Sequence, residues 1–215
     1  MSGNQQIFSV AMNAADRYRW DSHWNEATQE YKRALAEFPE DAAARSGLGF
    51  CYMQTKQWQQ ALDEYKYVLE RDPNNIIALS KTAELYGILG RREDTYKAYL
   101  RLADLYAEAG QGARSEAAWQ KSVQVSPNSP EPHERLAQYY FEKKDIPAMI
   151  QQRLAAARAY LLKEDFEAAR AQCEDVLWAD STNVQVQQLI MQITDGASSA
   201  GNARYGTKGS LADSA

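Results

Sequence analysis

Residues 26–41, EATQEYKRALAEFPED, can be laid over residues 60–75, QALDEYKYVLERDPNN, without a gap. The same offset holds at every matched position, and it matches aromatic, small and proline positions. It pairs Ala27 with Ala61, Tyr31 with Tyr65, Ala34 with Val68, and Pro39 with Pro73. A fixed period of about 34 residues is typical of repeat proteins, in which each repeat is one supersecondary unit.

The segments in front of these two stretches repeat at the same offset. They pair Ala14 with Leu48, Ala15 with Gly49, Tyr18 with Tyr52, and Trp24 with Trp58. Leu48, Gly49 and Tyr52 fall at i, i+1 and i+4, which is one stripe of a helix. Ala61 and Tyr65 begin a similar stripe on the next helix, and a proline ends that helix because its ring cannot continue the hydrogen-bond ladder. The sequence therefore predicts helix-turn-helix units that pack through small residues.

This pattern of small and aromatic residues resembles the tetratricopeptide repeat (TPR) family over about residues 5–194. The resemblance implies an all-α, right-handed solenoid of antiparallel helices, in which each hairpin covers the apolar face of its neighbour. It also implies a non-catalytic scaffold or adaptor that binds a partner segment in the concave groove. The alternative is a structural subunit of a larger multiprotein assembly, which would use lateral or end-on surfaces of the solenoid.

The spacing between repeats changes twice along the chain. The interval from Tyr52 to Tyr86 equals the offset of the first two units, whereas the intervals from Tyr86 to Tyr106 and from Tyr140 to Tyr160 are much shorter. Half a unit is therefore inserted twice, which gives two 54-residue blocks of three helices each. The predicted units are 8–41, 42–75, 76–129 and 130–183, with a capping helix at 184–194. We expect the middle helix of each block, at 92–109 and 146–163, to serve both hairpins and to exchange the inner and outer layers.

About eleven helices follow from this register. We expect them at 5–20, 24–37, 42–55, 58–71, 76–89, 92–109, 112–125, 131–143, 146–163, 166–179 and 184–194. Residues 1–195 would then form the solenoid. Residues 196–215 are rich in Gly, Ala and Ser and have almost no large apolar side chains, which predicts a disordered tail.

Composition argues against several classes of function. The chain has 29 acidic and 24 basic residues, and its net charge of -5 gives no electrostatic reason to bind nucleic acid. No stretch is apolar enough to insert into a membrane and the first residues do not resemble a secretory signal, so we expect a cytoplasmic protein. Cys51 and Cys173 form no metal or redox motif and are predicted to be buried.

Motifs for catalysis are also missing from the sequence. His23 and His133 are not in a metal-binding arrangement, and we expect them at the surface or at helix ends. No glycine-rich nucleotide motif occurs. The sequence therefore predicts no enzyme, no cofactor and no metal site.

Binding residues are expected on the first helix of each hairpin. The repeated tyrosines occupy packing positions, and in TPR proteins the other positions of the first helices line the groove. Carried over by the resemblance, the partner-binding residues are Met12, Asp16, Arg19, Trp20, Phe50, Met53, Gln54, Glu84, Ile88, Glu134 and Gln138. This set combines apolar and acidic side chains, which suits an amphipathic or basic protein or peptide partner. The sequence also leaves open that the chain associates with itself.

Some TPR proteins that bind chaperones hold a C-terminal carboxylate of the partner with Lys and Asn on these helices. Met12, Asp16, Ser46 and Phe50 stand at the corresponding positions of this chain. These side chains offer no cation for a carboxylate, so we do not expect that kind of partner.

Overall fold

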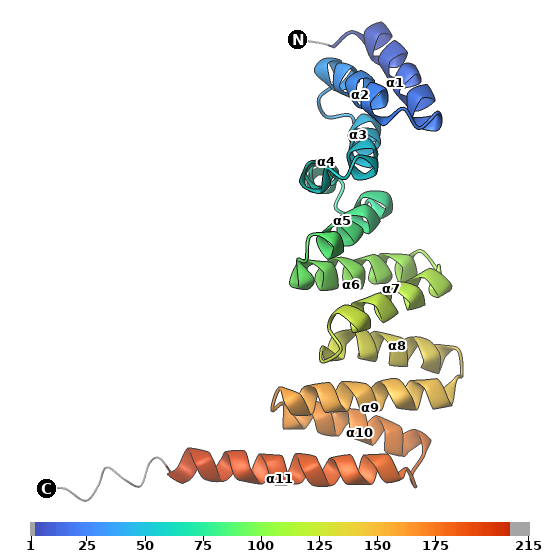
Figure 1. The fold of residues 1–215 in the computed structure, drawn as a ribbon. Coiled ribbons are helices and arrows are strands. Elements are labelled where there is room, and N and C mark those ends of the chain that lie inside the picture. The colour runs from blue at the N-terminus through green and yellow to red at the C-terminus, as the bar shows by residue number, and fades with distance from the viewer. Residues whose placement is uncertain (1–2, 207–215) are drawn as a thin grey trace, which may run out of the picture. The chain divides into compact units, whose positions relative to one another are not determined.

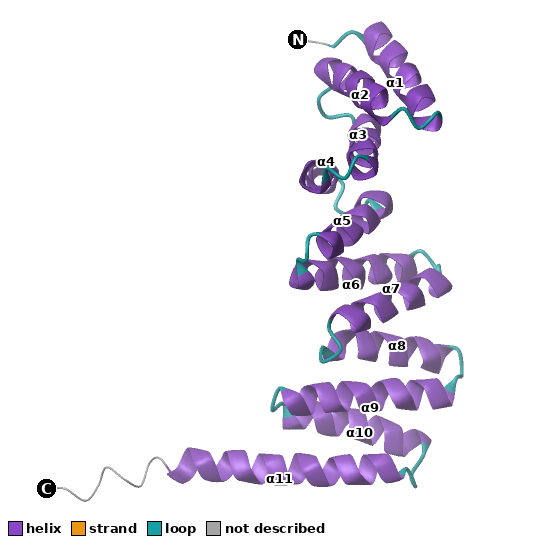
Figure 2. Ribbon diagram, in the orientation of Figure 1, coloured by secondary structure: helices purple, strands orange, loops and turns teal. Residues whose placement is uncertain are grey.

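A computed structural model describes residues 3–206 of the chain, with side chains described as far as residue 199. The described residues form eleven helices joined by short turns, with no strand among them (Figures 1 and 2). The helices are α1 (Gln5–Trp20), α2 (Trp24–Glu37), α3 (Ala42–Gln54), α4 (Trp58–Arg71), α5 (Ile76–Ile88), α6 (Arg92–Glu108), α7 (Gly112–Val125), α8 (Pro130–Glu142), α9 (Ile146–Leu162), α10 (Phe166–Ala179) and α11 (Val184–Gly206). The predicted all-α fold is confirmed.

Contacts between these helices define two compact units that meet in sequence between Ala109 and Gly110. Unit 1 comprises α1 to α6 and unit 2 comprises α7 to α11. Within each unit, every helix packs against the next one along the chain. The hairpins can be followed in Figure 1. Each unit is therefore a stack of antiparallel helical hairpins.

Short polar side chains cap the N-termini of the first helices of unit 1. Asn4 accepts hydrogen bonds from the backbone N–H groups of Gln6 and Ile7. Asp41 and Asn75, which occupy equivalent positions of successive repeats, each accept one from the third residue of the following helix, at 2.7 and 3.0 Å. The first N–H groups of a helix have no partner within the helix, and side-chain oxygens at this position supply one.

The turns inside the hairpins reproduce the repeat spacing in the backbone. Six of the described residues have a positive φ of 59–70°, and each follows a first helix: Ser22, Lys56, Gly90, Gly110, Lys144 and Glu164. The intervals between them are equal except for two short ones, from Gly90 to Gly110 and from Lys144 to Glu164, and the tyrosine spacing shortens at the same places. Two of the six are glycines, the residue for which this conformation is least costly.

Tyrosine rings and small residues build the core of unit 1. Tyr31 and Tyr65 are among the largest fully buried side chains of the described residues. A Cβ atom added to Gly49 would lie 3.0 Å from a ring carbon of Tyr65. The small residue predicted at position 49 is therefore required by the close approach of α3 to this ring.

Helix α9 has the shared role that the spacing predicts. It spans 17 residues, compared with 13 in α8. It packs against α8 and α10 and also touches α11, just as α1 packs against α2 and touches α3. Thus α9 closes one hairpin with α8 and opens the next with α10. The exchange of layers stays a prediction.

The last helix is longer than the sequence suggested. It was expected to end near residue 194, but α11 continues to Gly206, and residues 207–215 of the predicted tail lie outside the described residues. Gly196 permits close packing, because an added Cβ would lie 2.7 Å from the Phe166 ring. The hydroxyls of Ser198 and Ser199 donate to the backbone oxygens of Thr194 and Asp195, so these residues do not interrupt the helix.

His133 was expected at the surface or at a helix end, and its burial corrects the first of these alternatives. Its side chain is buried in the first turn of α8. The imidazole Nδ1 lies 2.8 Å from Oε1 of Gln152, and Nε2 lies 3.2 Å from the backbone oxygen of Pro127. The ring therefore ties α8 to α9 and to the preceding turn. His23 is exposed, and it directly precedes α2.

Candidate partner-binding site

The structure distributes the predicted binding residues over both units. Those of α1, α3 and α5 belong to unit 1, and those of α8 belong to unit 2. The contacts of unit 1 join α1 directly to α3. We call the surface formed by the predicted residues Met12, Asp16, Arg19, Trp20, Phe50, Met53 and Gln54 the α1/α3 face.

A buried tyrosine fixes the carboxylate at the centre of this face. The Tyr31 hydroxyl, from α2, donates to Asp16 Oδ1 at 2.6 Å. Arg19 donates to the same oxygen at 3.2 Å, one turn further along α1. Burial raises the pKa of Tyr31 far above its usual value, and the bond to Asp16 raises it further. The hydroxyl is therefore a permanent donor, and it holds the carboxylate in one orientation.

An aromatic pair lies beside this carboxylate. Trp24 of α2 meets the half-buried Phe50 of α3 edge to face, with ring centroids 5.8 Å apart and an interplanar angle of 70°. The Arg19 guanidinium carbon lies 6.0 Å from the centroid of the Phe50 ring. Three helices thus place a carboxylate, a guanidinium and an aromatic ring together. The sequence matched Trp24 with Trp58 in the repeat and did not name it as a binding residue, and the structure adds it to the site.

The other predicted residues of the face differ in exposure. Met12 and Met53 are partly buried and pack against the core of unit 1. Trp20, at the end of α1, is 89% exposed, and Gln54 is also exposed. The face therefore has apolar side chains that rest on the core and one large indole that projects from it.

The α5 residues add charge and apolar surface to unit 1. Glu84 forms an ion pair with Lys81 on its own helix, with an N–O distance of 3.0 Å. Ile88 is half exposed. The charge of Glu84 is thus partly balanced, as Arg19 balances that of Asp16.

The two predicted residues of unit 2 take part in hydrogen bonds within that unit. Glu134 accepts from the Tyr160 hydroxyl at 3.0 Å and from Gln172 Nε2 at 2.8 Å. Gln138 donates to Glu142 on its own helix at 2.9 Å. Binding through Glu134 would have to compete with two existing donors.

Tyrosine-carboxylate pairs recur in the molecule and were not predicted. Besides Tyr31 with Asp16, the hydroxyl of Tyr140 donates to Glu116 at 2.7 Å, and that of Tyr160 donates to Glu134. Burial, and next the bond to Glu134, raise the pKa of Tyr160 to about 12. Periodicity identifies the packing face of a tyrosine, but it does not show which carboxylate its hydroxyl reaches.

The described residues offer little for metal or thiol chemistry. No group of three or more His, Cys, Asp or Glu side chains in residues 3–199 is arranged to hold a metal ion. Cys51 and Cys173 are buried free thiols, as predicted, and burial raises the pKa of each to about 11. Thiols reach their reactive thiolate form less readily when their pKa is raised. No helix in the described part of the chain has the length and apolar character needed to cross a membrane.

Comparison with protein families gives a match for part of unit 1. A tetratricopeptide repeat model matches residues 21–85, which include the stretch that defined the repeat. The search of curated proteins gave no match.

Two solved TPR domains share the fold at low sequence identity. One is the TPR2B domain of yeast Sti1, described as a complex with pHsp70, with 19% identity and a TM-score of 0.51. The other is the TPR domain of Arabidopsis OM64, with 16% identity and a TM-score of 0.50. Each match covers 57% of this chain and 98% of the other. TPR proteins generally bind other proteins and are not enzymes. The repeat model thus identifies residues 21–85 as tetratricopeptide repeats, and the two solved domains show that the fold is that of TPR proteins.

Proposed function

We propose that the chain is a non-catalytic adaptor whose α1/α3 face binds an internal segment of a partner protein. The observation that carries this proposal is the fixed group formed by Asp16, Arg19 and Phe50. Tyr31 and Trp24 hold it from behind, so a partner would meet side chains that are already ordered. Such preorganisation lowers the entropy cost of binding. The yeast TPR2B domain, described as a complex with pHsp70, has the same fold and supports a binding role.

The chemistry of the face indicates the kind of segment. Phe50, Met53 and Trp20 offer apolar contact, and Asp16 offers a carboxylate oriented by two donors. Arg19, the cation of this group, is paired with Asp16. An apolar segment with a basic side chain satisfies this surface, whereas the C-terminal carboxylate of a partner would meet Asp16. We therefore propose a basic or amphipathic partner. We also propose a cytoplasmic location, which suits the two free thiols.

A comparative pull-down tests the site. The variant Phe50→Glu plus Met53→Glu should lose the partners that the unaltered chain retains. The matched control is Gln29→Glu plus Gln60→Glu, which adds the same charge at exposed positions of α2 and α4 and should keep them. Circular dichroism and thermal melting must show that both variants fold.

A less disruptive variant covers the case in which the double variant unfolds. Trp20→Glu alters a side chain that is 89% exposed and should weaken the same partners without changing the melting temperature. If every partner survives in all folded variants of the face, the α1/α3 face is not the binding site.

A second role, as a structural subunit of a larger assembly, is favoured by apolar side chains exposed on unit 2. Trp178 is 78% exposed and meets Phe141 edge to face at 6.3 Å. A large indole left in water is typical of interaction surfaces. Stoichiometric co-purification with a large complex that is lost in Trp178→Ser, but kept in Phe50→Glu, would support this role over the adaptor. Sedimentation of the isolated chain would show whether the same surface joins two copies.

A further inference from the structure

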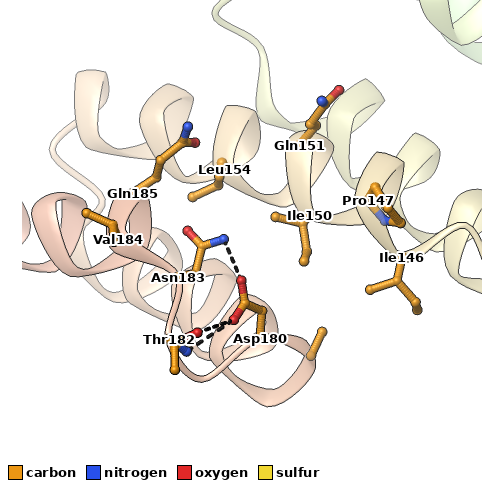
Figure 3. Close-up of a pocket in the computed structure, with 11 residues that line it drawn as sticks. Ile146, Pro147, Ile150, Gln151, Leu154, Asp180, Thr182, Asn183, Val184 and Gln185 are labelled. Atoms are coloured by element: carbon orange, nitrogen blue, oxygen red, sulfur yellow. Dashed lines mark hydrogen bonds between the residues drawn. The ribbon is translucent and has the colours of Figure 1, made fainter.

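Unit 2 contains a hollow outside the predicted first-helix positions. It lies between the first turns of α9, the turn from α10 to α11, and the start of α11, and it has a volume of about 570 Å³ (Figure 3). Ile146, Ile150, Leu154 and Val184 give it apolar walls. The hollow is open to solvent, so a side chain from outside can enter it.

The turn at its edge holds one carboxylate in place. Asp180 Oδ1 accepts from the backbone N–H of Thr182 at 3.1 Å and from its hydroxyl at 3.0 Å. Asp180 Oδ2 accepts from Asn183 Nδ2 at 3.1 Å, and these bonds are the dashed lines of Figure 3. The same donors lower the pKa of Asp180, so the group is a carboxylate at neutral pH.

The residues that line the hollow carry only negative charge. Asp180 is the sole charged residue among those that line it, and the polar remainder consists of uncharged amides and a hydroxyl. The turn before α9 contains Lys144 and Asp145, whose charges oppose each other, and Asp145 accepts from the backbone N–H of Ala148 at 3.1 Å. An occupant would therefore meet apolar walls and a fixed negative charge.

The amides suit a segment of protein chain. Gln151 on α9 and Gln185 on α11 both line the hollow and are exposed. A side-chain amide can donate to a backbone carbonyl and accept from a backbone N–H. The two could thus bind the main chain on either side of a side chain that enters the hollow.

We propose that this hollow is a second docking site, which takes an aliphatic side chain of a partner segment whose neighbouring residue is Lys or Arg. The aliphatic group would contact Ile150 and Val184, and the cation would pair with Asp180. The proposal is independent of the α1/α3 face and does not rest on its function.

Two capped hexapeptides test the site by NMR titration of the full chain. They differ at one position, with Leu-Arg at the centre of one and Leu-Glu at the centre of the other. We expect the Leu-Arg peptide to shift the amide signals of Asn183, Val184 and Gln185 at millimolar concentration and to bind at least threefold more tightly than the Leu-Glu peptide. The absence of shifts with both peptides at 5 mM, or equal affinities, would overturn the proposal.

Paired variants locate the binding. Val184→Lys should weaken the Leu-Arg peptide at least fivefold, because it removes an apolar wall and adds a repelling charge. Met191→Lys is the control, since Met191 lies on the same helix, is 68% exposed compared with 62% for Val184, and does not line the hollow. An equal loss in both variants would count against the site.

Asp180→Asn tests the charge and covers the case in which Val184→Lys does not fold. It keeps a side-chain oxygen for the turn and should abolish the preference for Leu-Arg over Leu-Glu. A preference that survives this change overturns the proposal. If the chain alone dimerises through the hollow, Val184→Lys will shift its sedimentation toward the monomer, which would assign the hollow to a second copy instead.

Discussion

Tyr31 links the core of unit 1 to the α1/α3 face through one hydroxyl group. The ring is 1% exposed, yet the hydroxyl reaches Asp16 on the face. Tyr31→Phe keeps the ring and removes a bond to a charged group, so we expect a loss of about 1 to 2 kcal/mol in the free energy of unfolding. Urea denaturation measures it.

Tyr65→Phe is the matched control for that measurement. Tyr65 is the repeat equivalent of Tyr31 and is 2% exposed, but the described residues provide no hydrogen bond to its hydroxyl. We expect a smaller loss of stability. Equal losses would show that the bond to Asp16 adds nothing to the burial of the hydroxyl.

Replacing two glycines within helices by alanine should change the stability of the protein in opposite directions. In Gly49→Ala, the new methyl group would lie 3.0 Å from the Tyr65 ring, so overpacking should cost about 1 to 3 kcal/mol. In Gly87→Ala, the nearest atom is 3.8 Å away, and the better helix propensity of alanine should add up to about 1 kcal/mol. Thermal melting of both variants tests this, and a stable Gly49→Ala would contradict the tight approach of α3 to the ring.

At the scale of the element, the turns inside the hairpins differ in how much conformational free energy their left-handed backbone requires. Glu164 has a φ of 59° without being glycine, and Gly90 has a φ of 70° with no atom near its missing side chain. Glu164→Gly should therefore stabilise the protein by about 1 kcal/mol, and Gly90→Ala should destabilise it by about 1 to 2 kcal/mol. Urea denaturation measures both changes in the free energy of unfolding. Two changes of the same sign would contradict this expectation.

The helices could be predicted because their determinants recur along the chain. Tyr86, Tyr106, Tyr140 and Tyr160 indicated both short intervals, and the left-handed turns have the same intervals. The last part of α11 has no such repeat, and Gly196 lies close to the Phe166 ring on α10. A contact between distant residues leaves no mark in local composition, so the helix past Asp195 was missed.

The sequence predicted the residues of the candidate site but not the contacts that hold them in place. The repeat placed Asp16 and Phe50 on first helices, and contacts between α1 and α3 bring those helices together. The donors that orient Asp16 come from Tyr31 on another helix and Arg19 on its own. Such pairings depend on helix packing in three dimensions, which a single sequence does not specify.

At the scale of the whole molecule, the buried tyrosines couple folding to alkaline pH. Burial raises the pKa of Tyr31 and Tyr65 far above the usual value, and burial with the bond to Glu134 raises that of Tyr160 to about 12. In the unfolded chain tyrosine ionises near pH 10. Between about pH 10 and 12 the folded chain therefore holds protons that the unfolded chain has lost, so stability must fall as pH rises.

The expected outcome is a urea midpoint that begins to decline above about pH 8.5, where the two buried thiols ionise in the unfolded chain first, and that declines further as the tyrosines follow from about pH 10 to 12. Lysines also titrate there, so the tyrosine part is the difference between the unaltered chain and Tyr160→Phe. The variant should lose less stability than the unaltered chain between pH 9 and 11.5, because it lacks one group that ionises more easily when unfolded. Identical declines would mean that Tyr160 ionises equally in both states, and would rule out a protecting role for its bond to Glu134.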